Sequence, residues 1–531
     1  MITTMNSPHA TFQMTSQRAL LWALLLSAAL LLLDLFTYSI FPTPWGDEIW
    51  LSEPAINLAT QGAFTTSTWP LQPPGAFWAA NTPLYSLLLA GWIHLAGQSL
   101  LALHALNYVL ITLAALIIWW AAGRFRLVTH PAARLLLIPL IHCGYTVSFA
   151  YRCSRPDILA LVNLLVFVLA LACSRREWRG PLAALSAGVA VWTGLQLGPW
   201  IGMATILFWW AGWIRVREVA WVIAGGFVGC ALLLLFFKTH GVLSDFFVGV
   251  TVGRAENLDC SFPSPLTKLK KILSAYILDY SLLPVILASG FFFFKWRSFF
   301  DADARKRVTI LFLFVIVPPL LLNLMGRFGW YYGYMMYVPA CLLLVFCHDR
   351  VVRQGKRSAA VPNLVLVLAA AAAIAIGLPK WLILGSYCFD LKAPSEIQRT
   401  LRQSIAPADV ACCENAVFFQ VKSVTSSVYS MSMFLLSDKL PDRERERVNV
   451  LVIFPKDAAR LTHYFGGEWV PAGPPFGDRR IARPVLPGAF LQKQFDHYLS
   501  TSITSREPVQ IFRRTTVQKP GEASPQPPEA R

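Results

Sequence analysis

Long hydrophobic blocks separated by short polar segments dominate the pattern of this chain. Between residues 19 and 379, eleven apolar blocks of roughly 16 to 22 residues follow one another. Their apolar residues run on without alternating with polar ones, which favours helices over strands. Backbone groups inside a bilayer cannot reach water, and a helix satisfies them within itself. The pattern therefore predicts an all-α, polytopic membrane protein with about eleven spans.

The predicted spans consist of a first block and five pairs. They cover residues 19–40, 100–122, 135–151, 158–173, 181–198, 200–214, 219–237, 276–294, 308–326, 329–347 and 359–379. The first block is too long for the core of a signal peptide, and no small-residue cleavage site follows it. We therefore expect a retained signal anchor.

The composition agrees with a membrane protein and indicates its orientation. Of the 531 residues, 56% are hydrophobic and only 14% are charged, whereas a soluble domain carries roughly 25% charged residues. Lys and Arg mark the cytoplasmic ends of short loops. If the amino terminus is cytoplasmic, every basic cluster between spans lies inside and the carboxyl end lies outside. Topology thus explains the net charge of +17, and no nucleic-acid motif is present.

One further apolar segment, "TPLYSLLLAGWIHLAG" at residues 82–97, tests this topology. It is short for a hydrocarbon core of roughly 30 Å. A full crossing would also move every later basic cluster to the outer side. We therefore predict a re-entrant or interfacial helix on the outer face, with a twelfth crossing as the alternative.

The chain after residue 380 has the pattern of a soluble α/β domain. "ADVACC" and "VNVLVIF" predict short buried strands, and "PKDAARLTHYF" predicts a helix that begins at Pro455. We divide the chain into a transmembrane domain at 1–379, an external domain at 380–515 and a Pro-rich disordered end at 516–531. Cys388 could form a disulfide with Cys412 or Cys413 on an external face, and buried free thiols are the alternative.

Two adjacent acids, Asp47 and Glu48, follow the first span, in a loop at 41–99 that contains no Lys or Arg. Neighbouring residues on a helix point about 100° apart, so both acids cannot face one reacting atom. One could act as a base while the other binds a metal, substrate or supporting residue. The alternative is that Asp47 caps an interfacial helix whose apolar side chains contact lipid.

A second polar cluster, "YRCSRPD", connects two predicted spans on the same outer side. The planar donor forks of Arg152 and Arg155 suit phosphate, and Asp157 opens the next helix. Arg327 lies in an aromatic segment at the same boundary. Snorkelling arginines and a helix cap are the alternative for the cluster. A carboxylate that deprotonates a hydroxyl, beside arginines that hold phosphate, would suit a substrate with an apolar tail and a phosphate head.

Three motifs, taken in order, resemble those of the membrane glycosyltransferases with the C-type fold. They are "DEIWLSEPAINLATQG", "NTPLYSLLLAGWIHLAG" and "RCSRPDILAL". The chain is most similar to the bacterial relatives of protein O-mannosyltransferases, the aminoarabinose transferases of lipid A and the rhizobial galacturonosyltransferases. It departs from their pattern at Asn81 and Thr82, where a Lys is usual, and His104 is the nearest candidate for a missing Arg.

The resemblance implies a polyprenyl-phosphate sugar donor and a lipid, glycan or protein acceptor, at the periplasmic face of a bacterial inner membrane. It implies that Asp47 is the base, that Glu48 assists it and that Asp157 orients an arginine or the acceptor. Arg152 and Arg155, together with Arg327, would hold the donor phosphate, and the reaction would invert the anomeric carbon. No cofactor is certain, and a divalent metal is possible because metal use varies in the family.

Two other classes of function stay open at this point. An O-antigen ligase or polymerase would use the long external loop at 238–275, but it leaves Asp47 and Glu48 unexplained. A transporter or flippase of lipid-linked sugars would bind substrate near the midplane between internal repeats, and no repeat is visible. A non-catalytic scaffold that presents the tail domain is a further alternative.

Overall fold

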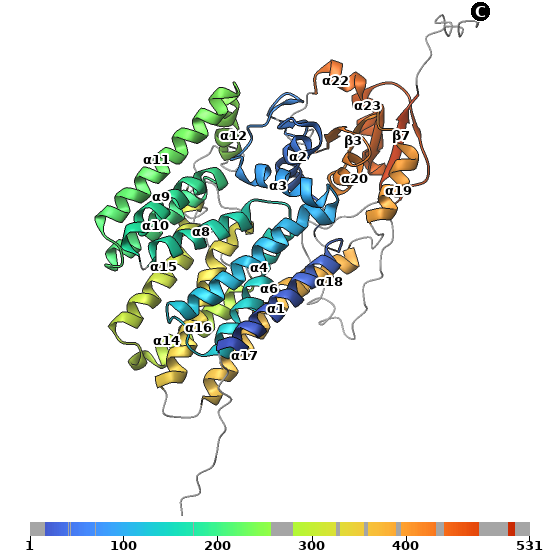
Figure 1. Cartoon of the computed structure of the whole chain (residues 1–531). Coiled ribbons are helices and arrows are strands. Elements are labelled where there is room, and N and C mark those ends of the chain that lie inside the picture. The colour runs from blue at the N-terminus through green and yellow to red at the C-terminus, as the bar shows by residue number, and fades with distance from the viewer. Residues whose placement is uncertain are drawn as a thin grey trace, which may run out of the picture.

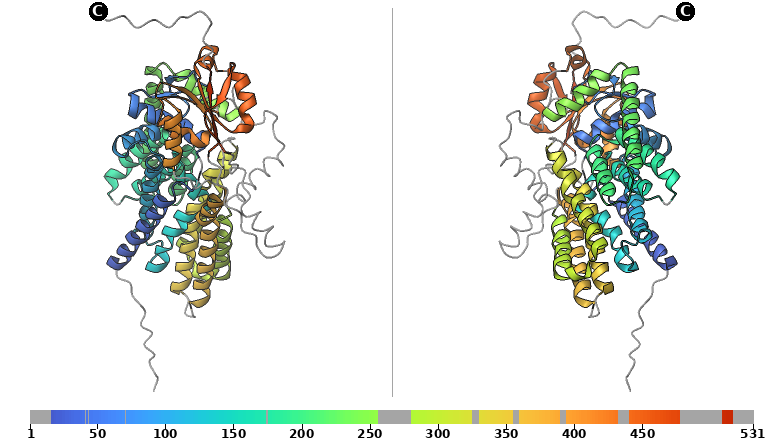
Figure 2. Two further views of the ribbon diagram at one scale, coloured as in Figure 1. Left: turned by 90° about the vertical axis from the view of Figure 1, so that its right-hand side faces the viewer. Right: turned by 90° about the vertical axis from the view of Figure 1, so that its left-hand side faces the viewer.

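The computed structural model is a helical bundle with a small mixed domain at one end (Figures 1 and 2). It describes residues 16–515 with gaps at 41, 43, 70, 174, 256–279, 325–329, 355–358, 389–393, 432–439 and 477–507. The predicted disordered end at 516–531 and the side chain of Cys388 lie outside the described residues.

Each predicted span contains helix. The bundle consists of α1 (Ser16–Thr37), α4 (Leu100–Arg124), α5 (Pro131–Leu135), α6 (Leu137–Cys143), α7 (Tyr145–Arg152), α8 (Asp157–Leu171), α9 (Arg176–Thr193), α10 (Leu197–Trp210), α11 (Val216–Thr239), α14 (Leu282–Lys295), α15 (Ala302–Leu324), α16 (Tyr334–Gln354), α17 (Ala360–Ile376) and α18 (Leu378–Cys388). Among the described residues, five helices are long and apolar enough to cross a bilayer, or six if one bent pair forms a single span, and four apolar helices are shorter. The all-helical polytopic prediction is confirmed, and the number of eleven spans stays a prediction.

The bent pair lies where the chain approaches its most polar turn. Residues 131–143 and α7 meet at an angle of 59°, at Gly144. A Cβ atom on Gly144 would lie 2.2 Å from the Tyr337 ring, and one on Gly377 would lie 1.5 Å from the Cys143 carbonyl oxygen. The two glycines therefore allow α16 and α17 to pack directly against the bend. After the bend, α7 ends at Arg152, and a turn at 153–156 leads into α8.

Glycines also allow α9 and α11 to pack backbone against backbone. A Cβ atom on Gly225 would lie 2.0 Å from the Ala184 carbonyl oxygen, and one on Gly229 would lie 2.6 Å from that of Gly188. Small residues let membrane helices approach closely. The resulting van der Waals packing stabilises the pair, because the hydrophobic effect does not drive helices together within lipid.

A compact lobe covers one end of the bundle (Figure 1). It contains α2 (Gly46–Gln61), the short antiparallel pair β1 (Thr65–Thr66) and β2 (Ala76–Phe77), and α3 (Leu84–Ala96). Helix α2 is enclosed by protein, with Ile49 and Ile56 buried, so the alternative that it contacts lipid is wrong. With 13 residues, α3 is about 20 Å long, and whether it crosses the bilayer stays a prediction.

The C-terminal domain lies at the same end of the bundle as α2 and α3 (Figures 1 and 2). Its elements are α19 (Pro394–Ser404), β3 (Val410–Cys413), α20 (Phe418–Lys422), β4 (Ser427–Ser430), α22 (Asp442–Arg447), β5 (Val450–Ile453), α23 (Ala458–Phe465), β6 (Trp469–Pro471) and β7 (Gln510–Arg514). The strand order is β4-β3-β5-β7-β6, with β4, β3 and β5 parallel and β7 antiparallel to both neighbours.

The strands predicted from "ADVACC" and "VNVLVIF" are β3 and β5, and both are almost wholly buried. The predicted helix at 455–465 begins with a 3-10 turn at Pro455 and continues as α23. Cys412 and Cys413 are free thiols in the core of the sheet, and burial raises the pKa of both. The alternative of buried free thiols is therefore the one that the structure shows.

Candidate active site

Asp47 and Arg155 form an ion pair at the end of the bundle that carries the lobe. Asp47 lies in the first turn of α2, whose N-cap is Trp45 in an extended conformation. Its Oδ2 atom lies 2.5 Å from Nη1 of Arg155, in the turn between α7 and α8. The alternative in which Asp47 caps its helix is wrong, because Trp45 is the N-cap.

Asp157 holds the other edge of the same guanidinium. Its Oδ2 atom accepts a 2.8 Å hydrogen bond from Nε of Arg155, and it is the first residue of α8. The Asp157 side chain is fully buried, and its Oδ1 atom has no hydrogen-bond partner among the described residues. Arg155 therefore bridges two carboxylates that the sequence places 110 positions apart, from Asp47 to Asp157.

Two aromatic rings pack over the faces of the Arg155 guanidinium. Its Cζ atom lies 4.1 Å from the ring centroid of Tyr331 and 5.0 Å from that of Trp45. The Arg155 side chain is 4% exposed, whereas that of Asp47 is 29% exposed. Asp47 is thus the one member of the cluster Asp47–Arg155–Asp157 that offers an open surface to a substrate.

Glu48 points away from Asp47, as the 100° offset predicts. Its buried Oε1 atom lies 2.6 Å from Nε2 of His104 and accepts a 2.9 Å hydrogen bond from the backbone N–H of Ser154. The hydroxyl of Ser52, one turn later on α2, donates to the Ser154 carbonyl. Glu48 and Ser52 therefore attach α2 to the turn that carries Arg155. The assisting role predicted for Glu48 stays a prediction.

Arg152 lies inside the bundle with other partners. It is fully buried, and its guanidinium donates to Oδ1 of Asp34 over 2.7 Å and to the Thr37 carbonyl over 2.5 Å. Asp34 also contacts Nε2 of His142 and accepts a hydrogen bond from the Tyr151 hydroxyl. A guanidinium without exposed surface cannot reach a donor phosphate unless Asp34 releases it. Its predicted phosphate contact stays a prediction.

The charge of the cluster sets a condition for phosphate binding. Two carboxylates and one guanidinium give the cluster a formal charge of −1, so a phosphate needs a further cation nearby. Arg327 is the predicted candidate, and it lies outside the described residues. Within the described residues, no group of three or more His, Cys, Asp or Glu side chains could hold a metal ion.

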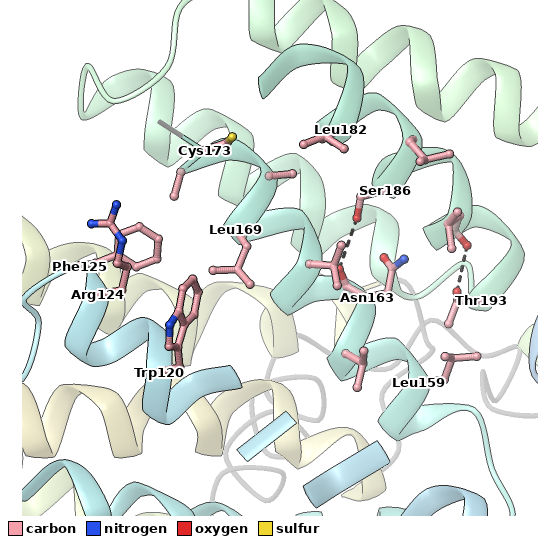
Figure 3. Close-up of a pocket in the computed structure, with 16 residues that line it drawn as sticks. Trp120, Arg124, Phe125, Leu159, Asn163, Leu169, Cys173, Leu182, Ser186 and Thr193 are labelled. Atoms are coloured by element: carbon pink, nitrogen blue, oxygen red, sulfur yellow. Dashed lines mark hydrogen bonds between the residues drawn. The ribbon is translucent and has the colours of Figure 1, made fainter. Parts of the chain in front are cut away.

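An apolar cavity of about 800 Å³ runs along α8 from the second residue after Asp157. Figure 3 shows its walls, which come from α4, α8 and α9. Asn163 is among its few polar side chains, and the backbone carbonyl of the same residue accepts a hydrogen bond from the Ser186 hydroxyl. A second apolar cavity of about 480 Å³ is lined by α8, α10, α15 and α16.

Sequence reasoning did not identify Trp45, Tyr331 and Ser154 as parts of this site. Trp45 stands two residues before Asp47, and Tyr331 stands in the aromatic segment that contains Arg327. One signal could have indicated Trp45 and Tyr331. An arginine that pairs with a carboxylate often packs against a nearby aromatic ring, so aromatic residues near the charged residues were candidates. Ser154 acts through its backbone, which no residue type reveals.

The chain is similar in structure to solved membrane glycosyltransferases. It superposes on ArnT from Cupriavidus metallidurans bound to undecaprenyl phosphate with a TM-score of 0.55 at 12% identity, over 95% of this chain and 99% of that one. The oligosaccharyltransferase of Archaeoglobus fulgidus gives a TM-score of 0.48 at 13% identity, over 84% of this chain and 69% of that one.

The mycobacterial arabinofuranosyltransferase AftD also gives a TM-score of 0.48, at 14% identity, over 93% of this chain and 40% of that one. The sequence matches no protein-family model and no curated protein. The full-length superposition on ArnT shows that the chain has the C-type glycosyltransferase fold, as the three motifs predicted.

Proposed function

We propose that this chain, whose fold is that of the C-type membrane glycosyltransferases, transfers a sugar from a polyprenyl-phosphate donor to a hydroxyl group of a lipid, glycan or protein acceptor. The observation that carries the proposal is the cluster Asp47–Arg155–Asp157 with Asp47 exposed. The solved ArnT structure contains undecaprenyl phosphate, which supports the donor class. The proposed location is the periplasmic face of a bacterial inner membrane.

In the proposed reaction Asp47 is the general base. Its open carboxylate oxygen takes the proton of the acceptor hydroxyl while the acceptor oxygen attacks the anomeric carbon of the donor sugar. The bond from that carbon to the phosphate oxygen breaks, and polyprenyl phosphate leaves with the bonding electrons. A single displacement needs no covalent sugar intermediate and inverts the anomeric centre.

Arg155 and Asp157 hold the base in place. Arg155 fixes Asp47 through Nη1, and Asp157 fixes Arg155 through Nε. A catalytic group held by its neighbours loses less orientational freedom when the substrate binds. Glu48 supports the same arrangement through His104 and Ser154, so we assign it a positioning role.

We propose that the donor phosphate binds chiefly at Arg327, with Arg155 contributing only through the 4% of its side chain that stays exposed. A second guanidinium would compensate the formal charge of −1 on the cluster. Arginine also forms paired hydrogen bonds with phosphate oxygens. The cavity along α8 supports an isoprenoid donor, since its apolar walls begin two residues beyond Asp157 and would pack against a hydrocarbon chain.

Purified full-length protein in detergent tests the proposal. It would be incubated with a panel of undecaprenyl-phosphate-linked radiolabelled sugars and an envelope lipid extract, with Asp47→Asn as the matched inactive variant. We expect labelled product and release of undecaprenyl monophosphate. In a parallel reaction with an undecaprenyl-diphosphate-linked glycan, transfer with release of undecaprenyl diphosphate would identify a ligase or polymerase reaction instead. Absence of product across the panel, with unchanged glycolipid masses in cells lacking the protein, would contradict the proposal.

A further inference from the structure

Glu53, in the middle of α2, is a buried carboxylate that the proposed mechanism does not use. Its side chain has no exposed surface. The Oε2 atom accepts hydrogen bonds from the hydroxyls of Thr66 and Thr68 and from the backbone N–H groups of Ser67 and Thr68, over 2.7 to 3.1 Å. Glu53 therefore fastens the loop beside β1 to α2.

The second oxygen of Glu53 faces the C-terminal domain. Oε1 has no hydrogen-bond partner among the described residues and lies 3.7 Å from Nζ of Lys422, at the end of α20. The Lys422 side chain is 4% exposed, and its ammonium donates to the Ser426 carbonyl over 2.7 Å. Burial lowers the pKa of Lys422, whereas the charge of Glu53 opposes that shift.

Apolar packing surrounds this ion pair. Phe418, Phe419 and Val421 of α20 belong to the same continuous hydrophobic core as Ile49 and Ile56 of α2. The pair is thus sealed from water, where a charge without its partner is costly. Lys422 and its apolar neighbours on α20 therefore connect the C-terminal domain to α2.

Helix α2 connects the buried Glu53–Lys422 pair to the proposed base, Asp47. Glu53 follows Asp47 by six residues, which is about 9 Å along a helix axis. We propose that Lys422 is a positioning residue through which the C-terminal domain holds α2, and with it Asp47, in the geometry that transfer requires. The inference rests on the proposed role of Asp47 and makes the domain a structural part of the transferase.

The test compares Lys422→Met with two other variants of the full-length protein. Arg513→Met is the matched control, because Arg513 pairs with Asp409 inside the C-terminal domain and also donates to the Ser404 carbonyl of the same domain. The double variant Glu53→Gln/Lys422→Met removes both charges and leaves no unpaired charge in the buried interface. It therefore distinguishes the loss of the ion pair from misfolding that an unpaired Glu53 carboxylate would cause in the single variant.

Hydrogen–deuterium exchange of the α2 amides at 46–57 is the first readout, and it needs no substrate. We expect Lys422→Met to raise exchange about tenfold across this segment, including the turn with Asp47, while Arg513→Met leaves it unchanged. Unchanged α2 exchange in Lys422→Met, or an equal rise in Arg513→Met, would overturn the inference.

Turnover of the undecaprenyl-phosphate sugar is the second readout. We expect Lys422→Met to lower kcat about tenfold or more at an unchanged donor KM, since a misplaced base weakens the chemical step rather than donor binding. The double variant should recover part of the loss. An equal loss of kcat in Arg513→Met would show that domain stability alone is responsible. If wild-type protein shows no turnover, the proposed function fails, and the exchange result still decides whether Lys422 holds α2.

Discussion

The Nη1 atom of Arg155 lies 2.5 Å from the Oδ2 atom of Asp47, although 108 residues separate the two along the chain. The contact joins the first turn of α2 to the turn that follows the bent helix α7. Asp47 keeps an exposed edge while Arg155 is enclosed by Trp45 and Tyr331. The pair thus presents a carboxylate, rather than a guanidinium, to the outside.

Asp47→Asn should abolish transfer without unfolding the protein. The amide keeps the size of the carboxylate but cannot take a proton, so we expect kcat to fall about 10²- to 10⁴-fold. Asp303→Asn is the control, because Asp303 is an exposed surface residue of α15 paired with Arg307. Turnover and thermal unfolding of both variants check this, and a fully active Asp47→Asn enzyme would remove the proposed base.

Arg155→Lys should be nearly as harmful as Arg155→Met. A lysine ammonium cannot offer Nε and Nη1 in one plane to Asp157 and Asp47, and it loses the stacking between Trp45 and Tyr331. We expect kcat to fall about 100-fold in both variants, since a misplaced base has an effect of that order. If Arg155→Lys retained wild-type turnover, positive charge alone would suffice and the bridging geometry would be irrelevant.

Arg152→Met should destabilise the bundle rather than act on the chemistry. The substitution leaves the buried Asp34 carboxylate without its guanidinium partner, and breaking a buried pair costs about 3–5 kcal/mol. The fluorescence-monitored unfolding temperature in detergent should fall accordingly. Arg217→Met, at an exposed position, should change stability by less than about 0.5 kcal/mol. Asp34→Asn/Arg152→Met should recover part of the loss, and an unaffected single variant would contradict the pairing.

Glu414 should make the stability of the C-terminal domain pH-dependent. Burial, together with the nearby Asp457 carboxylate, raises the pKa of Glu414 to about 7 from an ordinary value of 4.5. The folded domain therefore binds a proton that the unfolded chain releases, so stability is greatest below pH 4.5 and declines as the pH rises to about 7.

Glu414→Gln isolates this contribution, because it mimics the protonated acid at every pH. Near pH 4.5 the variant and the wild type should unfold alike, whereas at pH 8 the variant should be more stable by about 3 kcal/mol. Urea unfolding of the full-length protein at both pH values measures the difference. A constant difference between the two proteins across this range would show that Glu414 does not carry the proton.

The sequence predicted the parts of the fold that follow from local pattern. Continuous apolar blocks have one compatible structure in a bilayer, so every predicted span contains helix. The β-branched, apolar run "VNVLVIF" likewise specified β5, which is buried throughout. The prediction that Asp47, Arg155 and Asp157 share one side of the bundle also followed from counting spans, and the three side chains do meet.

The partners of the charged residues could not be predicted in the same way. Asp34 and Arg152 are 118 residues apart, and their pairing depends on how α1 packs against α7. Which of the adjacent acids faces Arg155 depends on the rotation of α2, and that rotation is fixed by the bond between Glu48 and His104. Such contacts are set by tertiary packing, which no short window of sequence contains.

The buried carboxylate of α1 has a consequence for biogenesis. Asp34 would cost up to about 3 kcal/mol in lipid, and its guanidinium partner is synthesised 118 residues later. At about 5–20 residues per second, a ribosome needs roughly 6 to 24 s for that interval. During this time the anchor helix must remain beside the translocon or another protein that shelters its charge, so its release into the bilayer should await the arrival of α7.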